Sequence, residues 1–167
     1  ALESIVLPDS ITTIGASAFD GCSKLSSVNY PLSWNTVNSF SGGNIFMGCV
    51  KLTSITVPEG VTAIPRYAFE DCNYLKTVIL PSTLTSIGAD AFSGCVALNN
   101  VNVPAGVTSL GNSAFYGCTS LTAITLPDGL TTLGQWAFQN CTALESIVLP
   151  DSITTIGASA FDGCSKL

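Results

Sequence analysis

Short runs of alternating side chains recur along the chain and predict β-strands. In the stretch LESIVL near the start, Ile5 and Leu7 are candidates to point inward and Val6 to point outward, which is the two-residue period of a strand. Pro8 ends this strand, because proline has no N–H to donate to a neighbouring strand. A second β-rich stretch follows at residues 11–14, and its equivalents lie at 61–64, 84–87, 107–110 and 130–133.

The interval between these runs is nearly constant, at about 23 residues with one longer step, which is typical of a solenoid. The prolines that mark it are Pro8, Pro31, Pro58, Pro81, Pro104, Pro127 and Pro150. Each coil reads approximately L-x-x-I-x-L-P-x-x-V-T-x-I-G-x-x-A-F-x-G-C-x-x-L. We predict one α/β repeat solenoid over residues 1–167, with seven coils of which the last is incomplete. A parallel sheet is expected on one face, with coils stacked about 4.8 Å apart over roughly 30 Å.

The rest of each coil contains a corner and a short outer segment. Gly15 permits the corner, and Pro65 at the same place in the third coil indicates that a negative φ is compatible there. Residues 16–19 lack β-branched side chains and predict one or two helical turns. The residue before each cysteine is Gly, Asp or Asn, the types that best tolerate a left-handed backbone. This position therefore predicts the C-terminal stop of a short helix.

The second coil departs most from the pattern. It carries four extra residues within about 32–44, including Trp34 and the Gly42-Gly43 pair, and it has Ile45-Phe46 where other coils have Ala-Phe. We expect a surface bulge there. An exposed Trp34 is costly to leave in water, so we expect it to contact a neighbouring coil, a second strand of a fibre or a glycan.

Composition narrows the classes of function. The net charge is −6 and there are only five Lys and Arg residues, so nucleic acid and anionic membranes are not expected partners. The chain has no histidine, which removes the usual general base and most zinc sites, and an enzyme or a cofactor is not expected. No apolar run approaches the roughly 18 residues of a membrane span. No signal peptide is evident, but a chain that begins in mid-pattern would look the same after trimming.

Two columns of repeated side chains are expected to form the core. Neighbouring cysteines in stacked coils would be about 4.8 Å apart at Cβ, beyond the roughly 3.5–4.5 Å of a disulfide, so we predict a buried, reduced column. The cysteines are Cys22, Cys49, Cys72, Cys95, Cys118, Cys141 and Cys164, an odd number. The phenylalanine column likewise serves every repeat rather than one ligand site.

The outward positions of the first strands are candidates for a binding face. They are uncharged, which suits contact with protein or glycan, and solenoid sheets are frequent binding surfaces. The alternative is that small β-formers simply make a good sheet surface. The candidate residues are Ser4, Val6, Asn29, Thr56, Ile79, Asn102, Thr125 and Val148, with Trp34 on the bulge.

Three further sets of polar residues have simpler explanations. The threonines at 12, 62, 85, 108, 131 and 154 predict hydroxyl ladders between coils, without a ligand. Asn140-Cys141-Thr142 is an N-x-S/T sequon, so Asn140 is a glycosylation candidate, although Cys141 is expected to be buried. The acidic residues after the prolines at 9, 59, 128 and 151 are interrupted by Ser82 and Ala105, and a solvated edge is expected there rather than a calcium site.

The pattern as a whole resembles the BspA-like, or Treponema pallidum type, leucine-rich repeats. The resemblance rests on L-P after the strand, I-G at the corner and A-F-x-G-C on the outer side, and it covers essentially the whole chain. Proline stands after the strand, as at Pro81, where the commonest leucine-rich repeats have Asn or Cys. The resemblance implies a right-handed leucine-rich-repeat solenoid with a parallel sheet. Members are typically secreted or displayed on the cell surface, several are adhesins, and catalysis is not a family property.

Residues 1–25 and 143–167 are identical, and the offset between the two copies corresponds to six coils. Either the parent chain is a tandem array of near-identical units, or one coil was duplicated by engineering; ordinary apolar coils at both ends favour the array. Two functions follow. The chain is a structural segment of an extracellular fibre or stalk whose partners are further copies of the same unit, or an adhesin that contacts a host protein or glycan.

Overall fold

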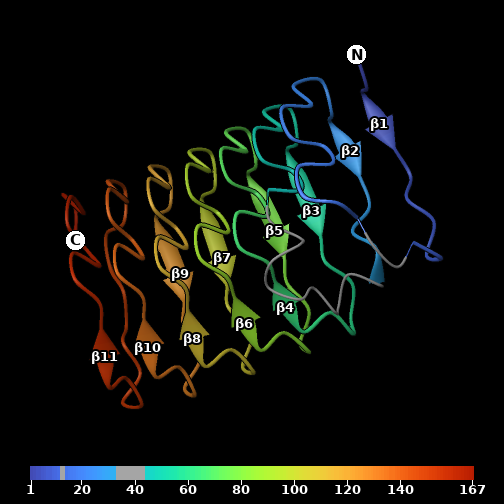
Figure 1. Ribbon diagram of the computed structural model, residues 1–167. Coiled ribbons are helices and arrows are strands. Elements are labelled where there is room, and N and C mark those ends of the chain that lie inside the picture. Colours follow the sequence, from blue (N-terminus) through green and yellow to red (C-terminus); the bar gives the residue numbers. More distant parts are fainter. Residues whose placement is uncertain (12–13, 33–43) are drawn as a thin grey trace.

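The computed structural model describes residues 1–11, 14–32 and 44–167, which wind into a solenoid of stacked coils. Figure 1 shows the N-terminal coil at one end of the stack and the C-terminal coil at the other. All strand pairs among these residues are parallel and join equivalent positions of successive coils, as Ser54 pairs with Thr77 and Thr132 with Thr155. The predicted solenoid and its coil length are therefore confirmed.

The first β-rich stretch of the coils forms one row of strands along the solenoid (Figure 1). The middle residue of each three-residue strand is buried and its two neighbours are exposed, as the alternation predicted. The row consists of a two-stranded sheet, β1 (Ser4–Ile5) and β2 (Ser27–Val28), and a four-stranded sheet, β3 (Ser54–Thr56), β5 (Thr77–Ile79), β7 (Asn100–Asn102) and β9 (Ala123–Thr125).

The second β-rich stretch forms another row, on the far side of the proline corner. The expectation of a sheet on one face was too narrow, because this row is also paired into a continuous parallel sheet of five strands. These strands are only two residues long. They are β4 (Ala63–Ile64), β6 (Ser86–Ile87), β8 (Ser109–Leu110), β10 (Thr132–Leu133) and β11 (Thr155–Ile156).

The outer segment of each coil is a run of turns, and the predicted short helices were wrong: the described residues contain no α-helix. In the first coil the Ala18 N–H donates to the Gly15 carbonyl oxygen, which closes a turn. The Phe19 N–H instead donates to the carbonyl oxygen of Ile45 in the next coil, at 3.0 Å. A helix would use both N–H groups within the segment. Here alternate N–H groups stack the coils, and this is incompatible with a helical turn.

Two backbone positions in each outer segment are left-handed. The residue before each cysteine has a φ between 57° and 76°, as predicted, but it closes a turn rather than ending a helix. The second position was not predicted, because it contains no glycine; its φ values lie between 54° and 66°, at Ser17, Asn44, Tyr67, Asp90, Ser113, Trp136 and Ser159. A left-handed φ is costly for residues as bulky as tyrosine and tryptophan. The repeated pattern of bonds between coils maintains it there.

The phenylalanines form a continuous stack through the core, as predicted. Successive rings have centroids 5.4–5.7 Å apart and interplanar angles of at most 12°. The rings at 46, 69, 92, 115 and 138 are fully buried. Since each ring contacts the ring of the coil before and after it, the same residue is required in every coil.

The cysteines are unpaired and line the same core, which confirms the reduced column. Each one from the second coil onward donates its S–H to the phenylalanine carbonyl oxygen of the preceding coil, at 3.0–3.2 Å, as Cys95 does to Phe69. Burial raises the pKa of the Cys49 and Cys141 thiols from 9.0 to about 12. The five cysteines from Cys49 to Cys141 are fully buried, and they act as small apolar groups with one weak hydrogen bond each.

The corner glycines from the fourth coil onward are required by close packing of successive backbones. A Cβ atom on Gly111 would lie 2.4 Å from the Ala89 nitrogen and 2.5 Å from the Gly88 carbonyl carbon of the preceding coil. None of the described corner glycines has a positive φ, in agreement with Pro65 at the same place. Their role is therefore to let coils approach, not to adopt a special conformation.

Candidate binding surface

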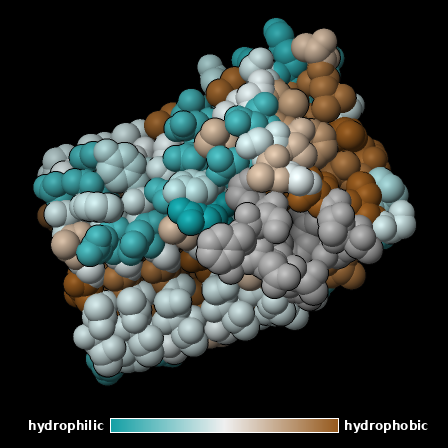
Figure 2. Space-filling view, in the orientation of Figure 1, coloured by the Kyte–Doolittle hydropathy of each residue, from teal (hydrophilic) through white to brown (hydrophobic). Residues whose placement is uncertain are grey.

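Figure 2 shows the outer surface as long rows of similar side chains that follow the solenoid axis. Hydrophobic residues gather near the N-terminal coils, on the right of this view. Because each row repeats one position of the coil, a local site must come from a place where a row changes its side chain.

The candidate face predicted from the first strands is exposed at every described position. The exposed fractions of Val6, Ile79 and Val148 are 84%, 55% and 82%, which is unusual for aliphatic side chains. The structure brings four of the predicted residues onto adjacent strands of one sheet, namely Thr56, Ile79, Asn102 and Thr125. Ser4 begins β1, and Val148 lies in a segment that is not paired as a strand. Trp34, Thr12 and the Gly42-Gly43 pair lie outside the described residues.

Asn29 has a structural role that the sequence did not reveal. Its side-chain amide donates to the Leu7 carbonyl oxygen at 2.8 Å, and its amide oxygen accepts from the Leu7 N–H at 2.7 Å. The side chain thus occupies the place of a backbone partner between the first two coils. Asn29 is committed to this contact, so it is a weaker binding candidate than Asn102 at the same position of the fifth coil.

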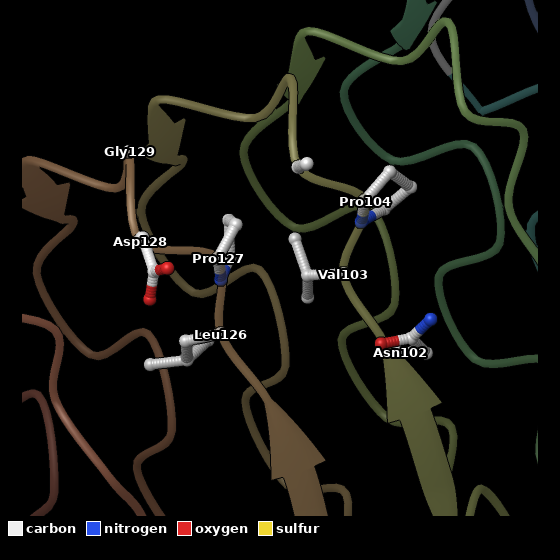
Figure 3. Close-up of a pocket in the computed structure, with 8 residues that line it drawn as sticks. Asn102, Val103, Pro104, Leu126, Pro127, Asp128 and Gly129 are labelled. Carbon is white, nitrogen blue, oxygen red and sulfur yellow. The ribbon is translucent and has the colours of Figure 1, made fainter.

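A shallow, open depression of about 400 Å³ lies where β7 and β9 end (Figure 3). Figure 3 shows Asp128 on one side of it and Asn102 on the other, with Leu126, Pro127 and Val103 between them. Pro104, Ala105 and Gly129 complete its lining. Of the predicted face residues, Asn102 is the one that lines this concave surface.

The acidic residues behind the prolines act locally. Both carboxylate oxygens of Glu59 accept hydrogen bonds from Ser82 in the next coil, from its N–H at 3.0 Å and from its hydroxyl at 2.9 Å. These bonds lower the pKa of Glu59. On the outer turns, burial and then neighbouring carboxylates raise the pKa of Glu70. The described residues contain no group of three or more residues that could hold a metal ion.

The threonine row forms the predicted ladder between coils. The Thr85 hydroxyl donates to the Thr62 carbonyl oxygen at 2.9 Å, and the Thr131 hydroxyl donates to that of Thr108 at 3.0 Å. The Thr154 hydroxyl continues the ladder to Thr131 at 3.2 Å. These hydroxyls are satisfied by the fold and do not indicate a ligand.

The sequon residue Asn140 lies in an outer turn with a φ of 61°. Its side-chain amide donates to the Tyr116 hydroxyl at 3.3 Å, and Cys141 beside it is fully buried, as expected. Glycosylation would have to break the amide contact. It stays a prediction from the sequence.

Two of the five basic residues lie against aromatic rings. The Lys51 ammonium is 4.7 Å from the centre of the Tyr74 ring, and the Arg66 guanidinium is 4.4 Å from that of Tyr67. Such contacts are typical of isolated surface cations and do not form a basic patch. No helix in the described ranges has the length and hydrophobicity of a membrane span.

Comparison with solved structures gives extensive matches. A leucine-rich repeat protein of T. pallidum is 33% identical with a TM-score of 0.86, and the match covers 99% of this chain and 78% of that one. A leucine-rich repeat protein of Bacteroides ovatus is 26% identical with a TM-score of 0.58, over 99% of this chain and 59% of that one. A leucine rich cell surface protein of Faecalibacterium prausnitzii is 27% identical with a TM-score of 0.57, over 99% and 65%. Comparison with curated protein sequences gives no match.

The profile of the BspA type leucine-rich repeat region matches residues 1–41 and 41–167, in six copies. The match spans every coil described above, including the proline corner, the glycine corner and the phenylalanine-cysteine turn. The resemblance seen in the sequence is thereby confirmed. The chain belongs to the BspA-type leucine-rich repeat family.

Proposed function

We propose that this chain is a non-catalytic structural segment of a bacterial surface protein, in which further copies of the same unit continue the stack of coils into a fibre or stalk. The observation that carries the proposal is the uniform register between successive coils, together with the identity of residues 1–25 and 143–167. A coil that stacks on its neighbour through repeated positions can stack equally well on the next unit.

The contact between the sixth and seventh coils supports this arrangement. Residues 143–167 repeat the first coil, so in the proposed array this contact corresponds to the one between the last coil of a unit and the first coil of the next. The Phe138 N–H donates to the Ala160 carbonyl oxygen at 2.8 Å, and the Phe138 and Phe161 rings stack 5.6 Å apart. A further unit would therefore meet the stack with matching groups, and its phenylalanines would extend the ring column.

Family membership supports a surface location. The relative from Faecalibacterium prausnitzii is named a leucine rich cell surface protein, and its fold extends over 99% of this chain. The absence of histidine and the 10% content of charged residues favour a scaffold over an enzyme.

A second candidate function is adhesion through the first-row sheet. It is favoured by Ile79, an isoleucine that remains 55% exposed between uncharged neighbours on a flat sheet. Solenoid sheets are frequent binding surfaces, and Ile79 adds apolar area to such a contact with a protein. Adhesion to host cells should fall in Ile79→Lys and remain in Val96→Lys, where an exposed aliphatic side chain of an outer turn is changed in the same way.

A chain of two units tests the structural function. Residues 1–142 joined directly to residues 1–167 should form one continuous rod, longer than the single unit by six coils or about 29 Å. Small-angle X-ray scattering measures this as an increase in the maximum dimension. The matched control inserts ten Gly and Ser residues at the junction. If the direct and the linked chains scatter alike, as two separate bodies, the units do not stack and the proposal fails.

A further inference from the structure

The depression beside Asn102 lies between the fifth and sixth coils. We propose that this depression is a binding subsite for a neutral pyranose sugar, held between Asn102 and Asp128. The proposal rests on the adhesive function and adds to it a sugar ligand at one place. It does not depend on the stacking of further units.

A short side chain stands beside the depression at this junction. Between the third and fourth coils, Glu59 reaches across and accepts two hydrogen bonds from Ser82. The equivalent residues between the fifth and sixth coils are Ala105 and Asp128, and the methyl group of Ala105 cannot span the gap. Val103 is also smaller than Leu126 at the same position of the next coil. Ala105 therefore leaves open a place that Glu59 spans between the third and fourth coils.

The lining combines hydrogen-bonding groups with an apolar floor. The Asp128 carboxyl oxygens accept hydrogen bonds from hydroxyl groups, and the Asn102 amide both accepts and donates. Pro127 and Leu126 lie between these two residues in Figure 3 and present carbon atoms to the depression. A pyranose ring has the matching composition, because hydroxyls project from its edge and C–H groups cover its face.

The charge of the site and its few oxygen ligands disfavour anionic sugars, phosphate and calcium. Asp128 and a net charge of −6 disfavour an anionic sugar or a phosphate. A single carboxylate supplies too few oxygens for calcium, and the described residues contain no metal-binding group. The volume of about 400 Å³ lies within the range of roughly 300–1,000 Å³ typical of small-molecule sites.

The test is a titration of the full chain, labelled with ¹⁵N, with the methyl glycosides of glucose, galactose, mannose and N-acetylglucosamine. We expect saturable chemical-shift changes at the Asn102 side-chain amide and the Gly129 backbone amide for at least one sugar. For a small ligand in an open site the expected Kd is on the order of 1 mM. Methylammonium serves as the cationic probe.

Two variants test the site and a third serves as the control. Ala105→Gln restores a bridge like that of Glu59 and should abolish binding, while Asp128→Asn keeps the shape and should weaken it about tenfold. Asp151→Asn makes the same change at the equivalent position one coil later and should leave the Kd unchanged. The amide spectrum of each variant reports whether the fold is intact.

The proposal is overturned if no glycoside gives saturable shifts, if the shifts persist in Ala105→Gln, or if methylammonium binds and the sugars do not. Failure here is distinguishable from failure of the functions proposed above. Rod length and the effect of Ile79→Lys on adhesion are measured independently of Ala105 and Asp128.

Discussion

The turn side of the solenoid and its exposed first-row sheet follow opposite rules. On the turn side every described coil carries phenylalanine and cysteine, and the ring centroids stay between 5.4 Å and 5.7 Å apart along the stack. On the first-row sheet, one position carries Asn, Thr, Ile, Asn and Thr in successive coils from the second to the sixth. Repetition is required where a coil contacts its neighbours and is relaxed where it faces solvent. In this protein, the departures from the repeat are therefore the places to look for function.

The largest expected difference between the two regions is in core packing. Phe92→Ala should leave a cavity within the ring stack and lower the free energy of unfolding by about 3–5 kcal/mol. Ile79→Ala, on the exposed sheet, should change it by less than about 0.5 kcal/mol. Urea unfolding followed by circular dichroism measures both. Similar losses in the two variants would contradict the distinction between packed and solvent-facing columns.

The second comparison is between two glycines. Gly111→Ala places a Cβ against the backbone of the preceding coil and should cost roughly 1–3 kcal/mol of unfolding free energy. Gly129→Ala meets its nearest atom, the Ala105 carbonyl oxygen, at an ordinary 3.7 Å, so it should be neutral or slightly stabilising. Thermal unfolding of the two variants is the measurement. A neutral Gly111→Ala would show that the coils can move apart at the corner.

The buried thiols predict a loss of stability at alkaline pH. The pKa of Cys141 is raised by burial from 9.0 to about 12, so the folded state retains a proton that the unfolded state releases. The contribution of this pKa difference to the free energy of unfolding is complete below pH 9. It is lost as the pH rises toward 12, at roughly 1 kcal/mol per pH unit. The unfolding free energy of Cys141→Ala should decline less steeply above pH 9 than that of the parent chain. Parallel curves would show that Cys141 does not titrate in this range.

The smallest effect is expected at the acidic edge. Hydrogen bonds from Ser82 lower the pKa of Glu59. The contribution of Glu59 to the free energy of unfolding is therefore present above the ordinary pKa of 4.5 and is lost as the pH falls through the lowered pKa. Glu59→Gln should remove this part of the acid dependence with little change at pH 7. Ser82→Ala should bring the pKa of Glu59 closer to 4.5 in an NMR titration. An unchanged titration would mean that the bridge does not form in solution.

The coil length, the strand positions and both core columns were predictable because they depend on repeated side chains. Phe92 and Cys95 are recognisable as core by recurrence alone. The outer turns were not predictable, because the segment around Ala18 has a composition that suits a helix. The bond from the Phe19 N–H to Ile45 joins residues of two successive coils, and local sequence does not reveal it. The left-handed φ of Tyr67 and Trp136 was not predictable either, because it is maintained by bonds between coils.

The candidate surface was partly predictable. Alternation identified Asn102 as outward-facing, and the structure confirms its exposure. The depression beside it was not predictable. The side chain of Ala105 is too short to reach the next coil, and the sequence does not show that Glu59, at the same position of the third coil, bridges to Ser82. Asn29 was predicted to face outward, and it does. Its side-chain amide nevertheless bonds to the backbone of Leu7, and the position of Asn29 in the repeat does not predict this contact.

The hydrogen bonds on the turn side also give the solenoid a direction. At every described junction the phenylalanine N–H points toward the following coil and the accepting carbonyl points back, as between Phe92 and Ala114. The peptide dipoles of this column are therefore aligned, and they add along the axis as they do in an α-helix. Two ends of the same kind would place donor against donor, so a two-fold symmetric contact is disfavoured there. If further units continue the stack as proposed above, this column joins them head to tail, which gives an open assembly with a defined polarity.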